Sequence, residues 1–513
     1  SDLLRLAPEF LFDFWYIAVA YGACMVFAWW GYRWAGRFAE RPARHMGWRI
    51  GWRTIALVVL VLFSRGGVQL IPLGILNAGD YARPRYFPLV LNTPFTIMTS
   101  LGKPVVEERR YMPQEEADRL WPVEHHFTNR RNTPPDLRNA PTPPNVVVIM
   151  LESFSAEYSA HLAGGEGHMP FLDSLMRNGI CFTRAYANGR RSIDAVPAVV
   201  ASIPELMDEA FLSSPYAETP FTSLPSVLDD RGYASLFLHG GNNGTMSFDV
   251  FARTAGFQHY LGRNEYTGDK ADAGVWGVRD RPYLRYCADR LSRTRQPFLA
   301  TIFTLSSHHP YRLPEDEAAR FGPGTTQPLH ATLRYADDAL RGFFAASARE
   351  PWFANTLFVV TADHTADLLQ DNKINSTARD YWVPLVYYMP AHLPPTRVER
   401  VTQHIDILPT VLDLIGYEEP FFSFGQSALR EDAPAYGVTA RDHLYLLFSE
   451  YEELVFDGER PLIHRPIERP PPPSDTLNGS GREAEMQRTI EAIVQQFTTR
   501  LVERRLTIEP ILP

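Results

Sequence analysis

The sequence predicts an α/β protein whose mostly parallel central sheet is flanked by helices and preceded by transmembrane helices. Three features of the chain indicate this. From residue 145 onward, short apolar stretches of strand character alternate with stretches of helical periodicity. The first of these stretches, residues 146–151, is an unbroken apolar run, which is typical of a strand buried on both faces. Ahead of this region lie two apolar runs of roughly the 20 residues that a bilayer crossing requires.

The composition is that of an ordinary folded chain of 513 residues, long enough for two or three domains. Hydrophobic residues make up 45% and charged residues 21%, which excludes an intrinsically disordered protein. The net charge of −9 offers no general basic surface, so we expect no nucleic-acid partner. Cys24, Cys181 and Cys287 lie far apart without a CxxC spacing, which indicates neither a disulfide framework nor a zinc knuckle.

Residues 1–75 are predicted to form a membrane anchor with two transmembrane segments. The first segment, residues 10–31, carries one charge, Asp13, and has Tyr and Trp near both ends, as membrane-interface belts do. The second segment, residues 54–75, is apolar for ten residues before a serine and Arg65 interrupt it. It can span if Arg65 extends to an interface.

The loop between the two runs, residues 31–53, contains six arginines and one glutamate. The positive-inside rule places such a loop in the cytoplasm, so everything after residue 75 is expected outside the membrane. The alternative is a soluble protein with two buried helices joined by a basic loop. We favour the membrane anchor, because hydropathy assignments of this kind are usually reliable.

The rest of the chain is predicted to contain three parts. Residues 76–144 are rich in proline and arginine and are expected to form an extended linker. Residues 461–513 hold a Pro-rich segment and then an amphipathic helix, with Met486, Ile490, Ile493, Val494, Phe497 and Leu501 on one stripe. Residues 145–460 are expected to form the main α/β domain, with strand candidates at 146–151, 235–239, 298–305, 356–363 and 383–389, and helical stretches at 170–178, 222–231, 278–292 and 328–346.

Chemically reactive side chains follow the predicted strands, at the point where each strand ends. Glu152 comes directly after the first strand, and His239 ends the strand at 235–239. Because ligands bind at the carboxyl ends of strands in open α/β sheets, we expect these side chains to gather at one edge. Other strands are followed by further candidates: Arg190, Arg191 and Ser192 in NGRRSID, Asn242 and Asn243 in HGGNNG, His308 and His309 in SSHHPY, and Asp363 and His364 in ADHTAD.

Each candidate has an ordinary structural explanation when it is taken alone. Glu152 and Ser192 could cap the helices that follow them. His308 or His309 could be turn residues, and HGGNNG could be only a flexible turn. Their joint placement after five strands is what favours a functional site.

Together these residues could carry out metal-assisted transfer at phosphorus or sulfur. Glu152 and Asp363 offer oxygen ligands and His364 a nitrogen ligand, a set suited to Mn²⁺, Mg²⁺ or Zn²⁺. Ser192 bound to the same ion would lose its proton more readily and act as the nucleophile. At the start of a helix it would attack a phosphate held by backbone N–H groups. Four basic side chains could neutralise phosphate oxygens or protonate the leaving group: Arg190, Arg191, His239 and His308.

With these residues in this order, the chain resembles the alkaline phosphatase/sulfatase superfamily and, within it, the lipoteichoic acid synthase-like phosphoglycerol transferases. The resemblance covers roughly residues 54–460 and rests on VVVIMLES, NGRRSID, HGGNNGTMSFDVFARTAGF, LSSHHPY, TADH and HIDILPTVLDLIG. It implies contact of His239 and His308 with a phosphoglycerol head group, and a place in the bacterial cytoplasmic membrane. It also implies one Mn²⁺ ion held by Glu152, Ser192, Asp363 and His364.

The chain departs from the family pattern in ways that bear on its substrate. The family nucleophile is threonine where this chain has Ser192, and the family's substrate-binding Trp and Arg fall on Met246 and Phe248. Asn242, Asn243 and Asp249 are candidates to replace those contacts. The segment SIDAV lacks the Cys/Ser-x-Pro-x-Arg signature of a formylglycine nucleophile, which argues against a true sulfatase. The few cysteines also make a phosphoethanolamine transferase a weaker candidate.

The leading hypothesis is a membrane-anchored transferase that acts by two in-line displacements. Ser192 attacks the phosphodiester of phosphatidylglycerol or a similar lipid, and the phosphoglycerol group then passes to a glycan or polymer hydroxyl outside the membrane. One alternative is a phosphodiesterase or phosphatase that hands the same intermediate to water. Another is a pseudoenzyme that binds a glycan or lipid without turnover, against which the four retained metal-type residues argue.

Overall fold

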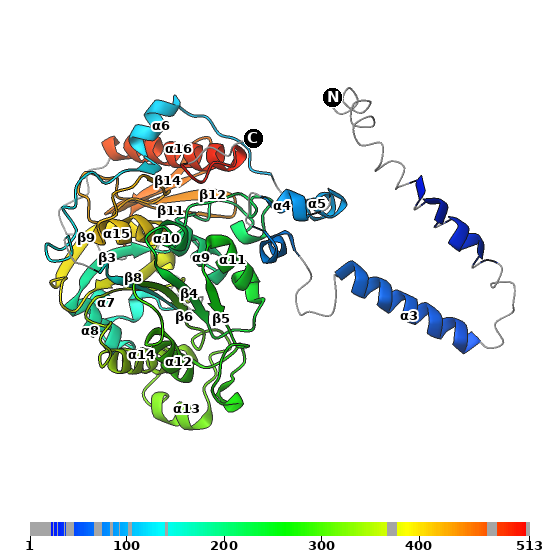
Figure 1. Cartoon of the computed structure of the whole chain (residues 1–513). Coiled ribbons are helices and arrows are strands. Elements are labelled where there is room, and N and C mark those ends of the chain that lie inside the picture. Colours follow the sequence, from blue (N-terminus) through cyan, green and yellow to red (C-terminus); the bar gives the residue numbers. More distant parts are fainter. Residues whose placement is uncertain are drawn as a thin grey trace. The chain divides into compact units, whose positions relative to one another are not determined.

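The protein is described from a computed structural model, which divides the chain into two compact units, Ser1–Leu73 and Gly74–Pro513 (Figure 1). All candidate site residues lie in the second unit. The described residues are 22–23, 25–27, 29–34, 36, 46–65, 74–82, 86–91, 93–100, 105–138, 142–366, 377–468 and 480–508.

In the first unit, helix α3 (Met46–Arg65) is 20 residues long and contains most of the second apolar run. Nearly all of its described side chains are exposed, Trp52, Leu57 and Phe63 among them. Within the part of the chain that the structure describes, no helix is both long enough and apolar enough to cross a membrane. The first predicted span, residues 10–31, lies largely outside the described residues. Both transmembrane segments therefore remain predictions.

The second unit is built on an eight-stranded sheet in the order β5-β4-β6-β2-β7-β8-β3-β9. β8 is antiparallel to both of its neighbours, and all other neighbouring pairs are parallel, so the predicted mostly parallel sheet is confirmed. The strands are β2 (Asn145–Leu151), β3 (Ile180–Tyr186), β4 (Ala234–His239), β5 (His259–Leu261), β6 (Phe298–Phe303), β7 (Thr356–Ala362), β8 (Trp382–Tyr388) and β9 (Thr396–Gln403).

All five strand candidates of the sequence correspond to strands of this sheet. Every residue of β2 is buried, as its unbroken apolar run predicts for a strand with both faces covered. The edge strands β5 and β9 were not predicted. β9 reads TRVERVTQ and is exposed over most of its first half, so its sequence shows neither an apolar run nor a clean alternation.

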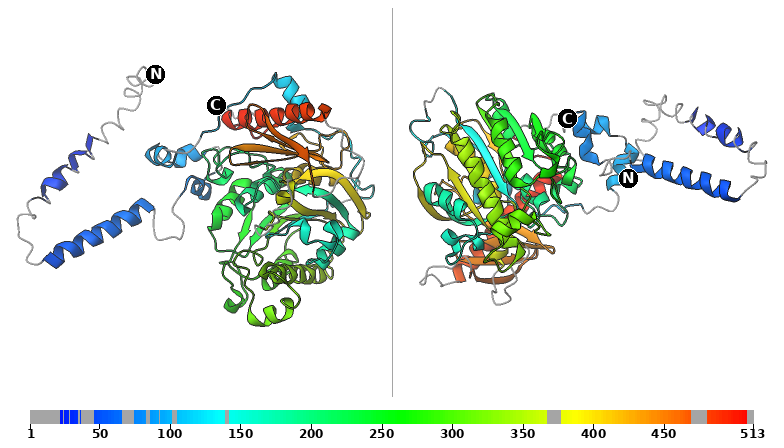
Figure 2. Two further views of the ribbon diagram at one scale, coloured as in Figure 1. Left: turned by 180° about the vertical axis from the view of Figure 1, so that it is seen from behind. Right: turned by 90° about the horizontal axis from the view of Figure 1, so that it is seen from below.

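Two groups of helices cover the two faces of the sheet (Figures 1 and 2). In one group α12 and α8 pack on α14, and in the other α9 packs on α10, α11 and α15. The four predicted helical stretches correspond to α8, α10, α12 and α14. The bounds are α7 (Ala160–Ala163), α8 (Pro170–Asn178), α9 (Ser192–Ala201), α10 (Leu224–Asp229), α11 (Phe248–Ala255), α12 (Asp280–Leu291), α13 (Glu315–Phe321), α14 (Pro328–Ser347) and α15 (Ile407–Leu414).

The C-terminal part adds a second sheet and a long helix. A four-stranded antiparallel sheet consists of β11 (Gly437–Arg441), β12 (Leu444–Phe448), β13 (Glu452–Phe456) and β14 (Pro461–Pro466). Because β14 belongs to this sheet, the folded domain extends beyond the predicted boundary at residue 460. Helix α16 (Ser480–Val502) packs on β12 and β13 and buries its whole predicted apolar stripe, from Met486 to Leu501.

The segment 76–144, expected as an extended linker, instead folds in part onto this body. Helix α6 (Gln114–Leu120) packs on α16, and β1 (Glu124–His125) pairs with β10 (Phe421–Phe422). The backbone N–H groups of Tyr111 and Met112 both donate to Gln495 Oε1 on α16. The physical reason is that the segment contributes its own core side chains, including Met112, Ala117, Trp121 and Val123, which are buried. The first part of the same segment forms the short helices η1 (Ile75–Asp80), α4 (Phe87–Val90) and α5 (Thr93–Ser100).

Candidate active site

The candidate residues lie at the carboxyl ends of neighbouring strands. β2 lies between β6 and β7, with Glu152 directly after β2, and Asp363 and His364 directly after β7. His239 is the last residue of β4, on the other side of β6. The N–H of Asp363 donates to the carbonyl of Leu151 at 3.1 Å, which carries the pairing of β7 with β2 beyond the strand end. The sheet itself therefore holds the Glu152 and Asp363 segments side by side.

Glu152, Asp363 and His364 form a buried cluster in which one ligand atom from each residue lies within 4.8 Å of the others. His364 Nε2 is 3.2 Å from Asp363 Oδ2 and 3.9 Å from Glu152 Oε1. Ser192 Oγ donates to Asp363 Oδ2 at 2.8 Å and lies 3.5 Å from Glu152 Oε2. The structure thus brings together the four residues that the sequence predicts as metal ligands.

The backbone determines which oxygen of Asp363 faces Ser192. Asp363 Oδ1 accepts hydrogen bonds from the N–H groups of Ser153 and His364, both at 2.8 Å. Ser153 reaches this position because its φ of 59° turns the chain sharply after Glu152, in a region that non-glycine residues rarely occupy. Asp363 Oδ2 is therefore left for Ser192 and for a cation.

The tautomer of His364 follows from its other ring nitrogen. His364 Nδ1 lies 2.8 Å from the carbonyl oxygen of Thr365, which can only accept a hydrogen bond. Nδ1 must therefore carry the proton, and Nε2 keeps a lone pair directed at the two carboxylates. This is the arrangement in which a metal-binding histidine is oriented by a backbone carbonyl.

The charge balance of the cluster favours a bound cation. Burial raises the pKa of Glu152 well above its usual range, and the nearby Asp363 carboxylate raises it further. Two buried carboxylates side by side repel each other unless a positive charge lies between them. Two carboxylate oxygens, one imidazole nitrogen and one hydroxyl oxygen suit Mn²⁺, Mg²⁺ or Zn²⁺. The residues present therefore fit a divalent metal ion held by Glu152, Asp363, His364 and Ser192.

Ser192 is the first residue of α9, and it does not cap that helix. The N-cap is Arg191, and no side chain makes a capping hydrogen bond there. The loop before the helix is anchored by Asn188, whose Nδ2 donates to Gln403 Oε1 and to the carbonyl of Val438, both at 2.7 Å. Asn188 Oδ1 also accepts from the N–H of Ile405 at 3.0 Å. These bonds fix the start of α9, with its free N–H groups, beside the carboxylate cluster.

Arg191 is held in place by a carboxylate one turn along the same helix. Its Nε and Nη2 donate to the two oxygens of Asp194 at 3.0 and 2.8 Å, and these bonds raise the pKa of the guanidinium. The Arg191 side chain is still 52% exposed, so its guanidinium is accessible from solvent. Gly189 allows the fit, because a Cβ there would lie 2.4 Å from Asp194 Cβ. Arg190, on the same loop, is half-buried.

His239 is buried against two aromatic rings. Its imidazole stacks on Phe303 at 4.9 Å and meets the edge of Phe248 at 5.6 Å. Its Nδ1 lies 3.2 Å from the carbonyl oxygen of Phe303, so Nδ1 carries the proton of the neutral ring. Burial lowers the pKa of His239 to about 4. His239 is therefore neutral near pH 7 and presents Nε2 as a hydrogen-bond acceptor, which suits a hydroxyl.

The buried imidazole of His239 should make the protein less stable in mild acid. An ordinary pKa near 6.5 in the unfolded chain means that unfolding takes up a proton below that pH, so this contribution is lost as pH falls from about 6.5 to about 4. Relative to His239→Gln, the wild type is expected to lose about 2 kcal/mol of unfolding free energy between pH 7 and pH 4.5. Urea unfolding at each pH measures this. His259→Gln, at an exposed histidine, is the control, and parallel profiles for wild type and His239→Gln would contradict the expectation.

His308 lies in the loop after β6, on the strand between those that end in His239 and Glu152. His308 Nδ1 lies 2.8 Å from the carbonyl oxygen of His309, which again leaves Nε2 with the lone pair. The ring of His309 is exposed and meets Tyr311 edge-on at 5.6 Å. Of this pair, His308 is the half-buried residue whose ring is fixed by its backbone and neighbours.

The predicted substrate contacts of Asn242 and Asn243 are not supported by their surroundings. Asn242 Oδ1 accepts from Arg263 Nη1 at 3.0 Å, and Asn243 Nδ2 donates to Glu265 Oε2 at 3.1 Å. Both amides thus tie their loop to residues 263–265. Of the two positions that depart from the family pattern, Phe248 is buried beside His239 and Met246 is 39% exposed.

Several residues of the site were not predicted from the sequence. Ser153 orients Asp363, which lies on another segment, and Asp194 orients Arg191 from one helical turn away. Neither of the two follows directly after a predicted strand. Trp276 packs its ring 4.5 Å from that of His308 and donates from Nε1 to the carbonyl of His309 at 2.7 Å. Trp276 precedes a predicted helix and not a strand end, so a search at strand ends passes over it.

Comparison with known proteins places these residues in a family. A sulfatase family profile matches residues 144–417. Lipoteichoic acid synthase 1 of Bacillus subtilis is 27% identical over 343 residues, which are 62% of this chain and 53% of that protein. Lipoteichoic acid synthase of Staphylococcus aureus is 22% identical over 364 residues, which are 65% of this chain and 55% of that protein. The chain thus spans about half the length of the curated relatives it matches.

Two solved structures share the fold. A protein in the alkaline phosphatase superfamily from Vibrio parahaemolyticus matches with a TM-score of 0.66 and 22% identity, over 78% of this chain and 99% of that one. The lipoteichoic acid synthase LtaP from Listeria monocytogenes matches with a TM-score of 0.62 and 19% identity, over 76% and 98%. The family profile covers more than half of this chain, from β2 to the end of α15. The chain belongs to the sulfatase family, and its sequence is similar to those of lipoteichoic acid synthases.

Proposed function

We propose that the chain is a metal-dependent phosphotransferase that moves a glycerophosphate group from a phosphatidylglycerol-like lipid to a hydroxyl of an extracytoplasmic glycan or glycerophosphate polymer. The observation that carries this proposal is the contact of Ser192 Oγ with Asp363 Oδ2 at 2.8 Å, beside Glu152 and His364. A hydroxyl that lies among metal ligands at a helix start, and that caps nothing, is suited to attack phosphorus.

The names of the matched relatives support the choice of donor and acceptor. Several are lipoteichoic acid synthases, and a synthase of such a polymer needs a glycerophosphate donor and a hydroxyl acceptor. The two predicted membrane segments would hold the site near a lipid donor. We therefore propose that the protein resides in the bacterial cytoplasmic membrane, with its catalytic domain on the outer side.

In the first displacement, Ser192 Oγ forms a bond to the phosphorus of the lipid. The bond between phosphorus and the diacylglycerol oxygen breaks, and phosphoglycerol stays on Ser192. A divalent ion bound by Glu152, Asp363 and His364 would favour the deprotonated form of Ser192, whose hydroxyl proton leaves to solvent before the attack and returns after the second displacement. Arg191 and the free N–H groups of α9 neutralise the phosphate oxygens. The protonated form of His308 gives its Nε2 proton to the departing diacylglycerol oxygen.

In the second displacement, a hydroxyl of the acceptor attacks the same phosphorus. The bond between phosphorus and Ser192 Oγ breaks, and Ser192 is restored. Neutral His308 takes the proton of the attacking hydroxyl at Nε2, so one imidazole serves both steps in opposite protonation states. His239 accepts a hydrogen bond from a glycerol hydroxyl at Nε2, because its buried ring stays neutral. Water in place of the acceptor would make the protein a phosphodiesterase.

Loss of the Asp194 carboxylate should weaken the binding of the substrate phosphate by Arg191, because Asp194 fixes the position of that side chain. In Asp194→Asn the negative charge and one of the two accepting oxygens are lost, which is expected to lower kcat/KM for the lipid about tenfold or more. The control is Asp338→Asn, which breaks ion pairs with Arg281, Arg320 and Arg341 outside the site. The measurement is kcat/KM for the lipid in both variants, and circular dichroism checks that both are folded. Equal losses in the two variants would assign Asp194 a structural role only.

A methyl group added at Gly241 should block the accepting face of His239. A Cβ at Gly241 would lie 2.5 Å from His239 Nε2, and the buried ring cannot retreat without losing its contact with Phe303. We expect Gly241→Ala to lower turnover about 100-fold, as small displacements of substrate-positioning groups do. Gly342→Ala on α14, where a Cβ meets nothing within 4 Å, is the control. Normal turnover by Gly241→Ala would remove His239 from the site of glycerol binding.

Release of diacylglycerol from fluorescent phosphatidylglycerol tests the proposed function. The full chain in detergent or liposomes is assayed with Mn²⁺ or with chelator, and then with and without a glycan acceptor. Release that requires the metal and Ser192, and that rises with acceptor, supports the transferase. Release at the same rate without acceptor indicates a hydrolase. Absence of release from phosphatidylglycerol, together with release from phosphatidylethanolamine, would replace phosphoglycerol by phosphoethanolamine.

A further inference from the structure

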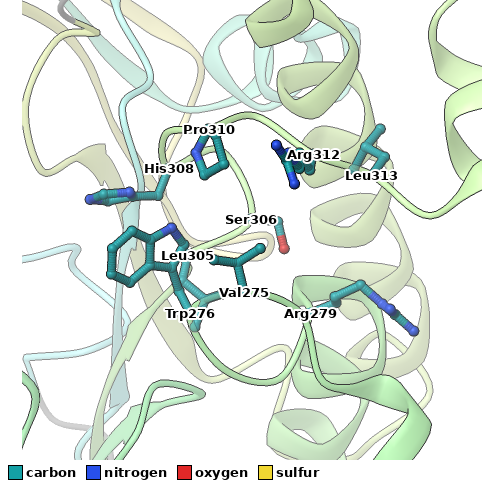
Figure 3. Close-up of a pocket in the computed structure, with 10 residues that line it drawn as sticks. Val275, Trp276, Arg279, Leu305, Ser306, His308, Pro310, Arg312 and Leu313 are labelled. Carbon is teal, nitrogen blue, oxygen red and sulfur yellow. The ribbon is translucent and has the colours of Figure 1, made fainter.

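A small hollow lies beside His308, and the mechanism above does not use it. We call it the Trp276 hollow. Figure 3 shows Trp276 and His308 at one side of it, Arg312 and Leu313 at the other, and Val275 between them. Val275 and Trp276 come from the loop before α12, and His308, Arg312 and Leu313 come from the loop after β6.

The hollow is rigidly attached to the catalytic turn that carries His239. Gly277, next to Trp276, packs backbone to backbone on Gly240 and Gly241, and a Cβ at Gly277 would lie 2.2 Å from the carbonyl oxygen of Gly240. The N–H of Val278 donates to that same carbonyl at 2.9 Å. Trp276 itself is fixed by its hydrogen bond to the carbonyl of His309. A ligand in the hollow would therefore have a defined position relative to both catalytic histidines.

Two large apolar side chains at the hollow, Trp276 and Val275, are exposed to solvent. Trp276 is 45% exposed and Val275 is 62% exposed. A rigid exposed indole beside a fixed imidazole forms an aromatic wall, and its negative ring face attracts the C–H groups of a ring that lies against it. Exposed apolar surface that borders a concave site is a common mark of ligand binding.

The charge at the rim of the hollow is positive. Arg312 is exposed and, within the described part of the chain, has no hydrogen-bond or ion-pair partner. Arg279 also lines the hollow, and its Nη2 donates to a neutral partner, the carbonyl of Ala271, at 2.8 Å. The residues that line the hollow include no Asp or Glu. The site thus combines an aromatic wall and an apolar floor with an uncompensated guanidinium.

We propose that the Trp276 hollow binds an anionic sugar unit of the acceptor, with the sugar ring against Trp276 and Val275 and the negative charge on Arg312. This inference rests on the proposed function and names the class of acceptor. The hollow opens beside His308, so a hydroxyl of the bound unit, or of the unit next to it, reaches the imidazole that takes its proton. The positive rim selects charged units over neutral ones, and the aromatic wall selects rings over open polyols.

Binding of three small probes to the full chain in detergent tests this double selectivity without any need for turnover. Glucose 6-phosphate carries both a ring and a charge, glucose carries the ring alone, and glycerol 3-phosphate carries the charge on an open polyol. Titration calorimetry is done on the Ser192→Ala protein without added phosphate or sulfate, because either anion would compete with the probes for Arg312. We expect glucose 6-phosphate to bind about tenfold more tightly than either of the others.

Two variants separate the contributions of ring and charge. Arg312→Gln should remove the preference for glucose 6-phosphate over glucose, and Trp276→Ala should remove the preference over glycerol 3-phosphate. Trp276→Phe keeps an aromatic face and should keep most of that second preference. Arg349→Gln, at an exposed arginine after α14, is the control and should change neither.

Three outcomes would overturn the proposal. Glycerol 3-phosphate that binds as tightly as glucose 6-phosphate would show that no ring is recognised. Equal affinities in Arg312→Gln, Trp276→Ala and the control would place binding elsewhere. A loss of binding to phosphatidylglycerol vesicles in Trp276→Ala, with unchanged sugar affinity, would assign the hollow to the lipid surface. If the chain fails to release diacylglycerol while the probe selectivity holds, the lipid donor is wrong and the anionic sugar site stands.

Discussion

Ser192→Ala is expected to lower release of diacylglycerol from phosphatidylglycerol by about a thousandfold or more. Ser192 Oγ is the only hydroxyl that contacts Asp363 Oδ2 among the described residues, and the proposed phosphoglycerol intermediate cannot form without it. The fold should be unaffected, because the loop before α9 is held by Asn188 and Asp194 and not by Ser192. The measurement is a fluorescent-lipid assay with Mn²⁺, next to thermal unfolding of the same samples.

Two further variants make this result specific to the nucleophile. Ser192→Thr keeps a hydroxyl and is expected to retain measurable release. Ser174→Ala on α8, away from the cluster, should behave as the wild type. Release by Ser192→Ala at more than about a tenth of the wild-type rate would exclude a covalent intermediate on this residue and favour direct attack by water or acceptor.

The second large effect is a reversal of stability between the wild type and Asp363→Asn when metal is removed. With chelator, the wild type must either hold two buried carboxylates side by side or take up a proton on Glu152, and both cost stability, so Asp363→Asn should be the more stable protein. With Mn²⁺ at about 100 times its dissociation constant, the wild type gains about 2.7 kcal/mol, and the order reverses. Asparagine preserves the geometry, because its Oδ1 can still accept from the N–H groups of Ser153 and His364.

Thermal unfolding of the wild type and Asp363→Asn, in chelator and in Mn²⁺, measures their relative stability without and with metal. Asp337→Asn is the control: this buried aspartate accepts from the N–H groups of Phe171 and Leu172 on α8, and its replacement should change stability equally with and without metal. If Mn²⁺ stabilises Asp363→Asn as much as the wild type, the cluster is not the metal site. Mg²⁺ and Zn²⁺ in the same assay rank the three candidate ions.

The sheet and the cluster could be predicted from the sequence because both depend on local patterns. An unbroken apolar run such as residues 146–151 identifies a strand covered on both faces, and the next residue must then lie at the sheet edge. Glu152, His239 and Asp363 were found in this way. No knowledge of the strand order was needed, because all carboxyl ends of parallel strands meet at one edge.

The features that escaped prediction depend on contacts between distant segments. The partner of Asn243 is Glu265, and the partner of Trp276 is the backbone of His309, and neither pairing has a local signal. The strand β8 is as apolar as the parallel strands β2 and β7, so its reversed direction cannot be read from its residues. The packing of residues 105–127 was missed because their prolines and charges resemble a linker, while a few scattered side chains such as Trp121 anchor them.

The anchoring of Asn188 has a practical consequence for the design of shorter fragments. The residues that match the family end at 417, yet the loop that positions Ser192 is bonded to the carbonyl of Val438 on β11. The N–H of Thr222 likewise donates to the carbonyl of Leu506, near the last described residue. A fragment that ends at residue 417 would keep all four proposed metal ligands but would lose a contact that positions Ser192, the proposed nucleophile. Expression for crystallography or screening should therefore extend from about residue 74, where the second unit begins, to at least residue 508.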